Sequence, residues 1–125
     1  MNFSTIIGQY GVKSKLLRSV KDERVIHAQI FAGPQGCGKL GLAIAFAQYI
    51  SCDDRQENDS CGRCSSCVKY EKLAHPDLHF VFPVINKGSG ETVCDNFITD
   101  WREFVNRSPY FNLNRWLSEI GVKNQ

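Results

Sequence analysis

The 125-residue sequence lacks a long apolar run, and no stretch approaches the roughly 20 apolar residues that span a bilayer. It also lacks a dominant charge, because 15 basic and 13 acidic side chains leave a formal net charge of +2. That charge is too small to indicate a nucleic-acid or membrane partner. Its first residues lack the basic-then-apolar layout of a secretory signal. We therefore expect a globular protein of the cytoplasm with no membrane partner.

Cysteine is the residue type that is unusually clustered, because four of the six cysteines stand close together at Cys52, Cys61, Cys64 and Cys67. Disulfides are rare in a reducing cytoplasm. Two C-x2-C steps let thiolates converge on one ion, and zinc prefers four such soft ligands in a tetrahedron. We predict a structural zinc module at residues 51–68, with no coordination position left open for water. Unliganded thiols or a redox pair are the alternatives.

Hydrophobic periodicity predicts helices that alternate with strands. Apolar side chains recur at the helical spacing in five segments: 9–21, 39–50, 68–73, 97–105 and 113–120, the last closed by Gly121. Two short runs, 25–32 and 77–83, are rich in apolar side chains and each ends at a proline or a Gly-Pro pair. Such runs are typical of buried strands. We therefore expect an α/β fold in which helices flank a parallel sheet.

A glycine-rich segment joins the first predicted strand to the helix that follows it. It consists of Gly33, Pro34, Gln35, Gly36, Cys37, Gly38, Lys39 and Leu40. This string matches G-x-x-x-x-G-K, the phosphate-binding loop. Glycines let successive N–H groups turn inward around an anion, and the helix N-terminus adds the positive end of its dipole. Lys39 would supply a positive charge to the outer phosphates.

The position after Lys39 departs from this motif, because Leu40 stands where a serine or threonine is required. That hydroxyl normally binds Mg²⁺, and a leucine side chain cannot bind a hard cation. The second predicted strand also has no carboxylate at its end, where an acidic residue would hold the magnesium shell. We therefore predict no catalytic residue and no ATP hydrolysis. Whether the loop still binds ATP or another anion, or only serves as a turn, stays open.

The order of these motifs resembles the N-terminal part of bacterial clamp-loader subunits, the AAA+ proteins of the DNA polymerase III holoenzyme. The resemblance covers roughly residues 3–83, through HAQIFAGPQGCGK, the cysteine spacing and HPDLHFVFP. It implies part of an AAA+ phosphate-loop domain at 1–83, with the zinc module inserted. Residues 84–125 would then be a loop and a helical pair, an insertion. We expect an N-terminal fragment that lacks the rest of the AAA+ domain and the collar.

Within this family the gamma and tau motor subunits carry a complete G-K-T/S, whereas the phosphate loop of the delta-prime type is often defective. Leu40 and the phrase HPD before an aromatic run look like the delta-prime type. The resemblance implies a non-catalytic subunit that contacts delta and gamma/tau. Through that complex it would help to load the sliding clamp onto primed DNA during replication.

Two enzymatic alternatives remain. A gamma/tau-type ATPase would need a metal-binding hydroxyl elsewhere, at Ser51 or Thr92, and neither is well placed. A nucleoside monophosphate kinase can pair a phosphate loop with a zinc lid. In such kinases, however, the loop lies almost at the N-terminus and the cysteine spacing differs.

Overall fold

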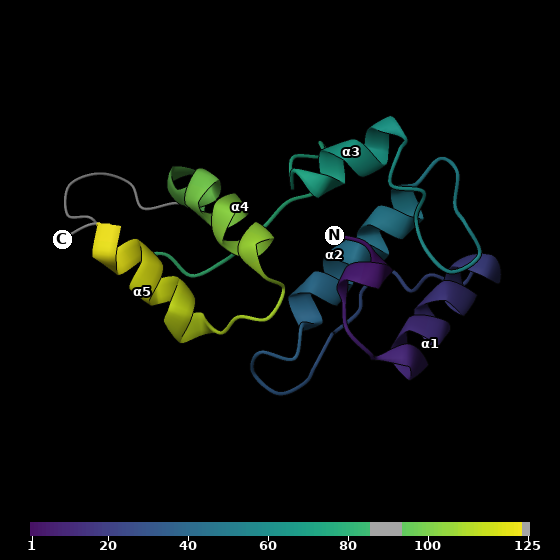
Figure 1. The fold of residues 1–125 in the computed structure, drawn as a ribbon, viewed down its shortest axis with the longest axis horizontal. Coiled ribbons are helices and arrows are strands. Elements are labelled where there is room, and N and C mark those ends of the chain that lie inside the picture. Colours follow the sequence, from purple (N-terminus) through teal and green to yellow (C-terminus); the bar gives the residue numbers. More distant parts are fainter. Residues whose placement is uncertain (86–93, 124–125) are drawn as a thin grey trace.

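The computed structural model describes residues 1–85 and 94–123 of the chain (Figure 1). Helices of the α and 3-10 types make up the regular structure of these residues. In chain order they are η1 (Phe3–Thr5), α1 (Tyr10–Lys21), α2 (Lys39–Ser51), α3 (Ser65–Glu71), η2 (Cys94–Phe97), α4 (Ile98–Arg107) and α5 (Leu113–Lys123). Within the described ranges, no helix has the length and apolar character that crossing a membrane requires.

The predicted α/β fold with a parallel sheet is wrong, because no residue of 1–85 or 94–123 lies in a β-strand. Segments 25–32 and 77–83 are irregular, and none of the described backbone hydrogen bonds joins them. Ile30 and Val81 are 94% and 95% exposed. A strand exists only where a neighbouring strand takes up its N–H and C=O groups. An apolar run predicts burial, but it cannot supply that neighbour.

The helix predictions agree with the structure more closely than the strand predictions do. Helices α1 and α2 begin and end within one residue of the predicted bounds, and α4 ends before Pro109 as expected. The prediction that Gly121 closes the last helix is wrong, because α5 continues through it to Lys123. A glycine inside a helix costs only about 1 kcal/mol relative to alanine, so the helix can continue through it when the flanking residues favour the helix. The loop predicted at 84–93 is irregular at residues 84 and 85, and its remaining residues, 86–93, lie outside the described part of the chain.

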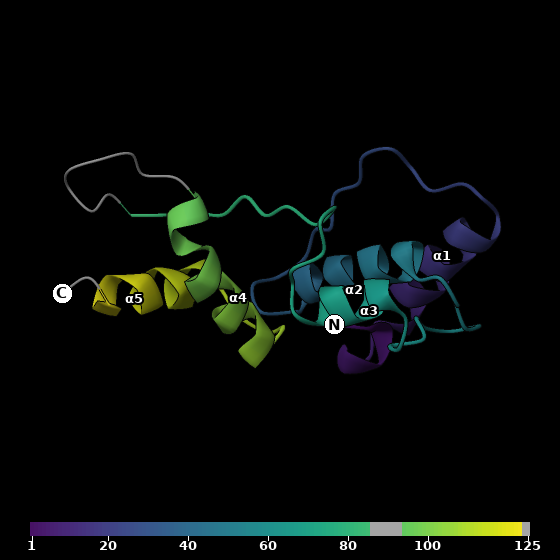
Figure 2. The ribbon, with the colours of Figure 1, turned by 90° about the horizontal axis from the view of Figure 1, so that it is seen from above.

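Two apolar clusters form the core, and α2 contributes to both. We call the first the aromatic cluster; its buried members are Met1, Ile44, Leu73, Phe82, Phe97, Trp101, Phe104, Val105, Trp116 and Ile120. The second, the N-terminal cluster, consists of Phe3, Ile6, Leu16, Leu17, Leu42, Ala45, Phe46 and Tyr49. Figures 1 and 2 show α2 between α1 on one side and the α4–α5 pair on the other. The phosphate-loop segment therefore leads into a central helix.

Ring packing holds the 77–83 segment in place without a sheet. The ring of Phe82 stacks on Trp101 at 4.4 Å between centroids and an interplanar angle of 6°. Trp116 meets Trp101 edge-on at 4.9 Å, and its Nε1 donates a hydrogen bond to the carbonyl of Pro83 at 2.7 Å. Trp101, Trp116 and Phe104 are nearly fully buried. The predicted apolar face of the last two helices therefore does serve as core.

Candidate metal centre and phosphate loop

Helix ends bring the four clustered cysteines together. Cys52 follows the last residue of α2, Cys64 is the N-cap of α3, and Cys67 lies in the first turn of α3. Cys61 stands in the loop between these helices. Their four sulfur atoms all lie within 4.8 Å of one another. Cys52 and Cys67 are buried, while Cys61 and Cys64 are half-buried.

Backbone amides point at the sulfurs. The N–H groups of Arg63 and Cys64 each donate to Cys61 Sγ at 3.3 Å, and they lower the pKa of Cys61 to about 6. The pKa of Cys64 is lowered by the N–H groups of Asp53 and Cys67. Donors of this kind stabilise a thiolate, which is the form that binds metals.

The pKa values of the two buried cysteines are shifted in the opposite direction. Burial raises the pKa of Cys52, although the N–H of Cys61 donates to its sulfur at 3.3 Å. Burial also raises the pKa of Cys67 to about 12. A buried thiolate is costly when no positive charge stands beside it. The half-buried thiols therefore ionise more readily than the buried pair.

The donor set fits a tetrahedral metal ion. Bond lengths of about 2.3 Å in a tetrahedron place sulfurs about 3.8 Å apart, and Cys61 Sγ lies 3.9 Å from Cys67 Sγ. All six cysteines of the chain are free thiols. Cys37 is outside this group, and so is Cys94, whose sulfur donates to the carbonyl of Phe82 at 3.3 Å. The four clustered cysteines can therefore hold a metal.

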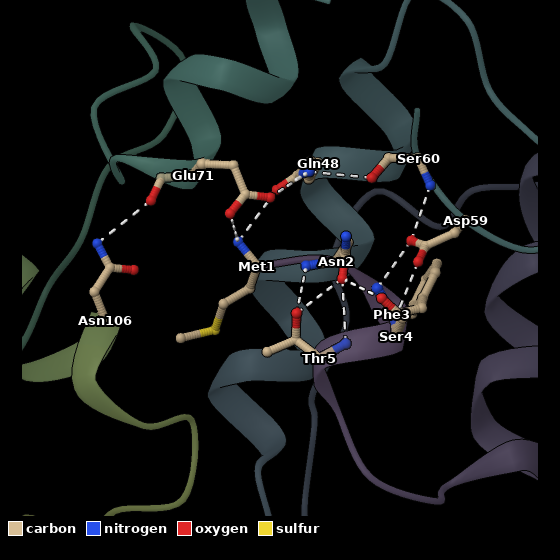
Figure 3. Close-up of polar contacts among 10 residues, drawn as sticks. All are labelled: Met1, Asn2, Phe3, Ser4, Thr5, Gln48, Asp59, Ser60, Glu71 and Asn106. Atoms are coloured by element: carbon tan, nitrogen blue, oxygen red, sulfur yellow. Dashed lines mark hydrogen bonds and ion pairs between the residues drawn. The ribbon is translucent and has the colours of Figure 1, made fainter. Parts of the chain in front are cut away.

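Asp59 ties the cysteine loop to the N-terminal segment (Figure 3). Its carboxylate accepts the N–H of Phe3 at 2.9 Å, of Ser4 at 3.1 Å and of Ser60 at 2.9 Å. In the same region Gln48 Nε2 donates to Ser60 Oγ at 3.1 Å. Sequence reasoning missed Asp59, because two of its partners lie 56 and 55 positions earlier in the chain. No local pattern reveals such a contact.

The phosphate-loop segment forms an irregular turn that ends at the first residue of α2. Gly36 and Gly38 have φ of +76° and +90°, a conformation that a side chain disfavours. Gly38 is the N-cap of α2 and offers no side chain to the N–H groups of the first turn. Lys39 Nζ donates to the carbonyls of Gly33 and Pro34 at 3.1 and 3.3 Å. The lysine therefore folds back over its own loop.

Contacts beyond the motif shape this loop further. A cavity of about 360 Å³ lies beside it, between α1 and residues 29–34. Leu40 is half-buried and packs against the aromatic cluster. Tyr110 packs on Gly38, where an added β-carbon would lie 2.9 Å from its ring. The Tyr110 hydroxyl also accepts the N–H of Ile7 at 2.6 Å. Sequence reasoning missed Tyr110, because its partners come from two distant segments.

Comparison with known proteins relates this chain to subunits of DNA polymerase III. The family model described as "DNA polymerase III, delta subunit" matches residues 8–117. The chain is 36% identical over 72 residues to DNA polymerase III subunit delta' of Bacillus subtilis, covering 58% of this chain and 22% of that protein. It is 26% identical over 107 residues to subunit tau of the same organism, covering 86% of this chain and 18% of that protein.

A third relative is subunit gamma/tau of DNA polymerase III from Mycobacterium tuberculosis. It is 36% identical over 67 residues, which is 54% of this chain and 12% of that protein. In each of these three relatives the match covers less than a quarter of the protein. No solved structure matches this chain.

Proposed function

Because this chain belongs to the family of DNA polymerase III clamp-loader subunits, we propose that it acts as a non-catalytic, delta-prime-like subunit. In this role it helps to load the sliding clamp onto primed DNA without hydrolysing ATP itself. The position of Leu40 carries the proposal. Its side chain packs against the aromatic cluster where the motif requires a magnesium-binding hydroxyl. An aliphatic group held in a core offers no oxygen to a hard cation.

Zinc is the metal that we propose for the four cysteines. Four sulfur donors within 4.8 Å of one another suit Zn²⁺, and four protein ligands would leave no open position for a reacting water. The ion would supply folding free energy to the polar loop between Cys52 and Cys61. In zinc-finger peptides this contribution is about 10–16 kcal/mol at neutral pH. We infer a structural role for this ion, in a module at 51–68.

Subunits delta and gamma/tau are the partners that we propose, with the sliding clamp and primed DNA reached through the complex. The family assignment supports this context. Mixing the purified chain with purified delta and gamma/tau tests it, with complex formation followed by size-exclusion chromatography. If neither subunit co-elutes with the chain, the partner proposal is contradicted.

ATP turnover tests the non-catalytic role. Hydrolysis with Mg²⁺ should stay at background for the chain alone, and Lys39→Ala should leave it there. In a mixture with gamma/tau, hydrolysis should likewise be insensitive to Lys39→Ala of this chain. Turnover by the chain that disappears in Lys39→Ala would contradict the proposal.

A gamma/tau-type ATPase is the second candidate, and the matches to gamma/tau subunits favour it. It would need a hydroxyl near the loop. Ser51 is at the far end of α2, about 18 Å along the helix from Lys39, and its Oγ lies 3.2 Å from the Tyr70 hydroxyl. Thr92 lies outside the described residues. Leu40→Thr separates the two readings: an existing motor should change little, whereas a defective loop should gain Mg²⁺-dependent ATP affinity.

A further inference from the structure

Helix α1 carries an unbalanced positive charge. Its residues, Tyr10–Lys21, include four basic side chains and no acidic one. Because the whole chain has a formal net charge of +2, the residues outside α1 sum to a net charge of −2. The small net charge of the chain therefore hides an uneven distribution. Figures 1 and 2 show α1 at one end of the molecule, away from the α4–α5 pair.

Three of these cations share the exposed face of α1. Lys15, Arg18 and Lys21 follow one another at three-residue steps, so they are neighbours on the helix surface, and all three are exposed. The opposite face packs Leu16 and Leu17 into the N-terminal cluster. Among the described residues, none of the three cations forms an ion pair. Their charges are therefore available to an anion from solution.

The surface beside these cations is hollowed and polar. A hollow of about 330 Å³ lies beside Arg18 and Lys21, and Ser14 and Asn58 also line it. Asp22, the residue that follows α1, sets one negative charge in this lining against the two positive ones. Guanidinium, ammonium, hydroxyl and amide groups are the side-chain donors that bind phosphate oxygens of nucleic acids. The hollow therefore suits a phosphate group.

An exposed aromatic ring stands at the start of the same helix. Tyr10 is 79% exposed, and Lys13 Nζ lies 5.6 Å from the centre of its ring. Ser14 lies one turn after Tyr10, and Arg18 lies one turn further along the same row. A basic surface next to an exposed ring is typical of proteins that bind single-stranded nucleic acids, because the cations follow the backbone while a base stacks on the ring.

We propose that the exposed face of α1 binds single-stranded DNA. Phosphates of the strand lie along Lys15, Arg18 and Lys21, and a base stacks on Tyr10. The choice of DNA rests on the proposed function, because the complex acts on primed DNA, whose template is partly single-stranded. The inference deepens that function, since this chain then contacts the DNA itself rather than only through other subunits.

Fluorescence anisotropy of a labelled oligothymidine, mixed with the purified chain at several salt concentrations, tests the role of the cations. The logarithm of the affinity for a single strand falls with the logarithm of the salt concentration, with a slope of about −0.7 per contacted phosphate. The triple variant Lys15→Gln, Arg18→Gln, Lys21→Gln should therefore weaken binding at least about tenfold at low salt and make the slope shallower by about 2. The three side chains are exposed, so the fold should be retained.

A second triple variant is the matched control, because it removes the same charge from exposed positions elsewhere. It consists of Lys69→Gln, Lys72→Gln and Arg115→Gln. Affinity and salt slope should stay close to those of the wild type. Equal losses in the two triple variants would show that only net charge matters, and the assignment to α1 would be overturned.

The ring provides an independent readout. Tyr10→Ala should weaken oligothymidine binding about fivefold or more, the value of one stacked base, whereas Tyr10→Phe keeps the ring and should bind like the wild type. Duplex DNA should bind more weakly than the single strand, because paired bases cannot stack on the ring. Equal affinity for duplex and single strand would refute the proposal. Competition by polyglutamate as strong as that by unlabelled oligothymidine would instead identify an acidic protein as the partner.

Co-elution with delta and gamma/tau separates this inference from the proposed function. The triple variant at α1 should co-elute with these subunits like the wild type. If oligothymidine does not bind while co-elution persists, the inference about α1 is wrong and the proposed function stands. If oligothymidine binds while neither subunit co-elutes, the partner proposal fails and the α1 assignment stands.

Discussion

Replacing Asp59 by alanine should destabilise the fold more than any other acidic substitution in the cysteine loop. The carboxylate of Asp59 accepts three backbone N–H groups, at 2.9, 3.1 and 2.9 Å. Two of these belong to Phe3 and Ser4, so the substitution detaches η1 from the loop. Phe3 is buried in the N-terminal cluster, with 2% of its surface exposed. Its N–H would lose its acceptor in a place that water reaches poorly.

The expected loss follows from these three bonds. Removing a capping carboxylate costs about 0.5–2 kcal/mol, and hydrogen bonds to a charged group contribute about 1.5–3 kcal/mol each when they are well buried. The bonds from Phe3 and Ser60 are only partly buried, and that from Ser4 is exposed. We therefore expect Asp59→Ala to lower the free energy of unfolding by about 2 kcal/mol. Asp59→Asn retains one acceptor oxygen and should lose about half as much.

Urea unfolding followed by far-ultraviolet circular dichroism measures this loss. Asp54→Ala is the matched control in the same loop. Asp54 forms an exposed ion pair with Arg63 at 3.7 Å, and its removal should change the free energy of unfolding by less than about 0.5 kcal/mol. Equal effects of Asp59→Ala and Asp54→Ala would refute the reasoning that Asp59 joins the two segments.

Three further outcomes are expected. Metal analysis should find one zinc ion per chain, and Cys67→Ser should abolish it and lower the unfolding midpoint; a midpoint that a zinc chelator leaves unchanged would contradict the structural role. Trp116→Phe should lower the free energy of unfolding in urea by about 1–2 kcal/mol because it leaves the Pro83 carbonyl without this donor, whereas Trp101→Phe removes a donor that has no partner among the described residues and should cost less; a larger loss for Trp101→Phe would contradict this reasoning. Gly41→Ala should destabilise by about 1–3 kcal/mol, because the added β-carbon would lie 2.5 Å from a proline side-chain carbon, and a neutral or stabilising effect in the same assay would contradict this close approach.

Much of the helical structure could be predicted, because a helix satisfies its backbone within itself. The spacing of apolar residues places α1, α2 and α4 almost as observed. The cysteine spacing predicts a cluster, and the structure brings the four sulfurs within 4.8 Å. The strand predictions failed for the opposite reason. Segments 25–32 and 77–83 have the composition of strands, but a sheet depends on partners that composition does not reveal.

Local pattern by itself determined where α1, α2 and α4 lie, which face of α4 is apolar, and that four thiols belong together, since each depends on residues a few positions apart. Only the tertiary structure decided that Asp59 accepts the first N–H groups of η1, that Tyr110 packs on Gly38, and that Trp101 Nε1 finds no acceptor among the described residues. These contacts join segments far apart in the chain. Their geometry is set by how the two clusters pack around α2, and no short stretch of sequence carries that information.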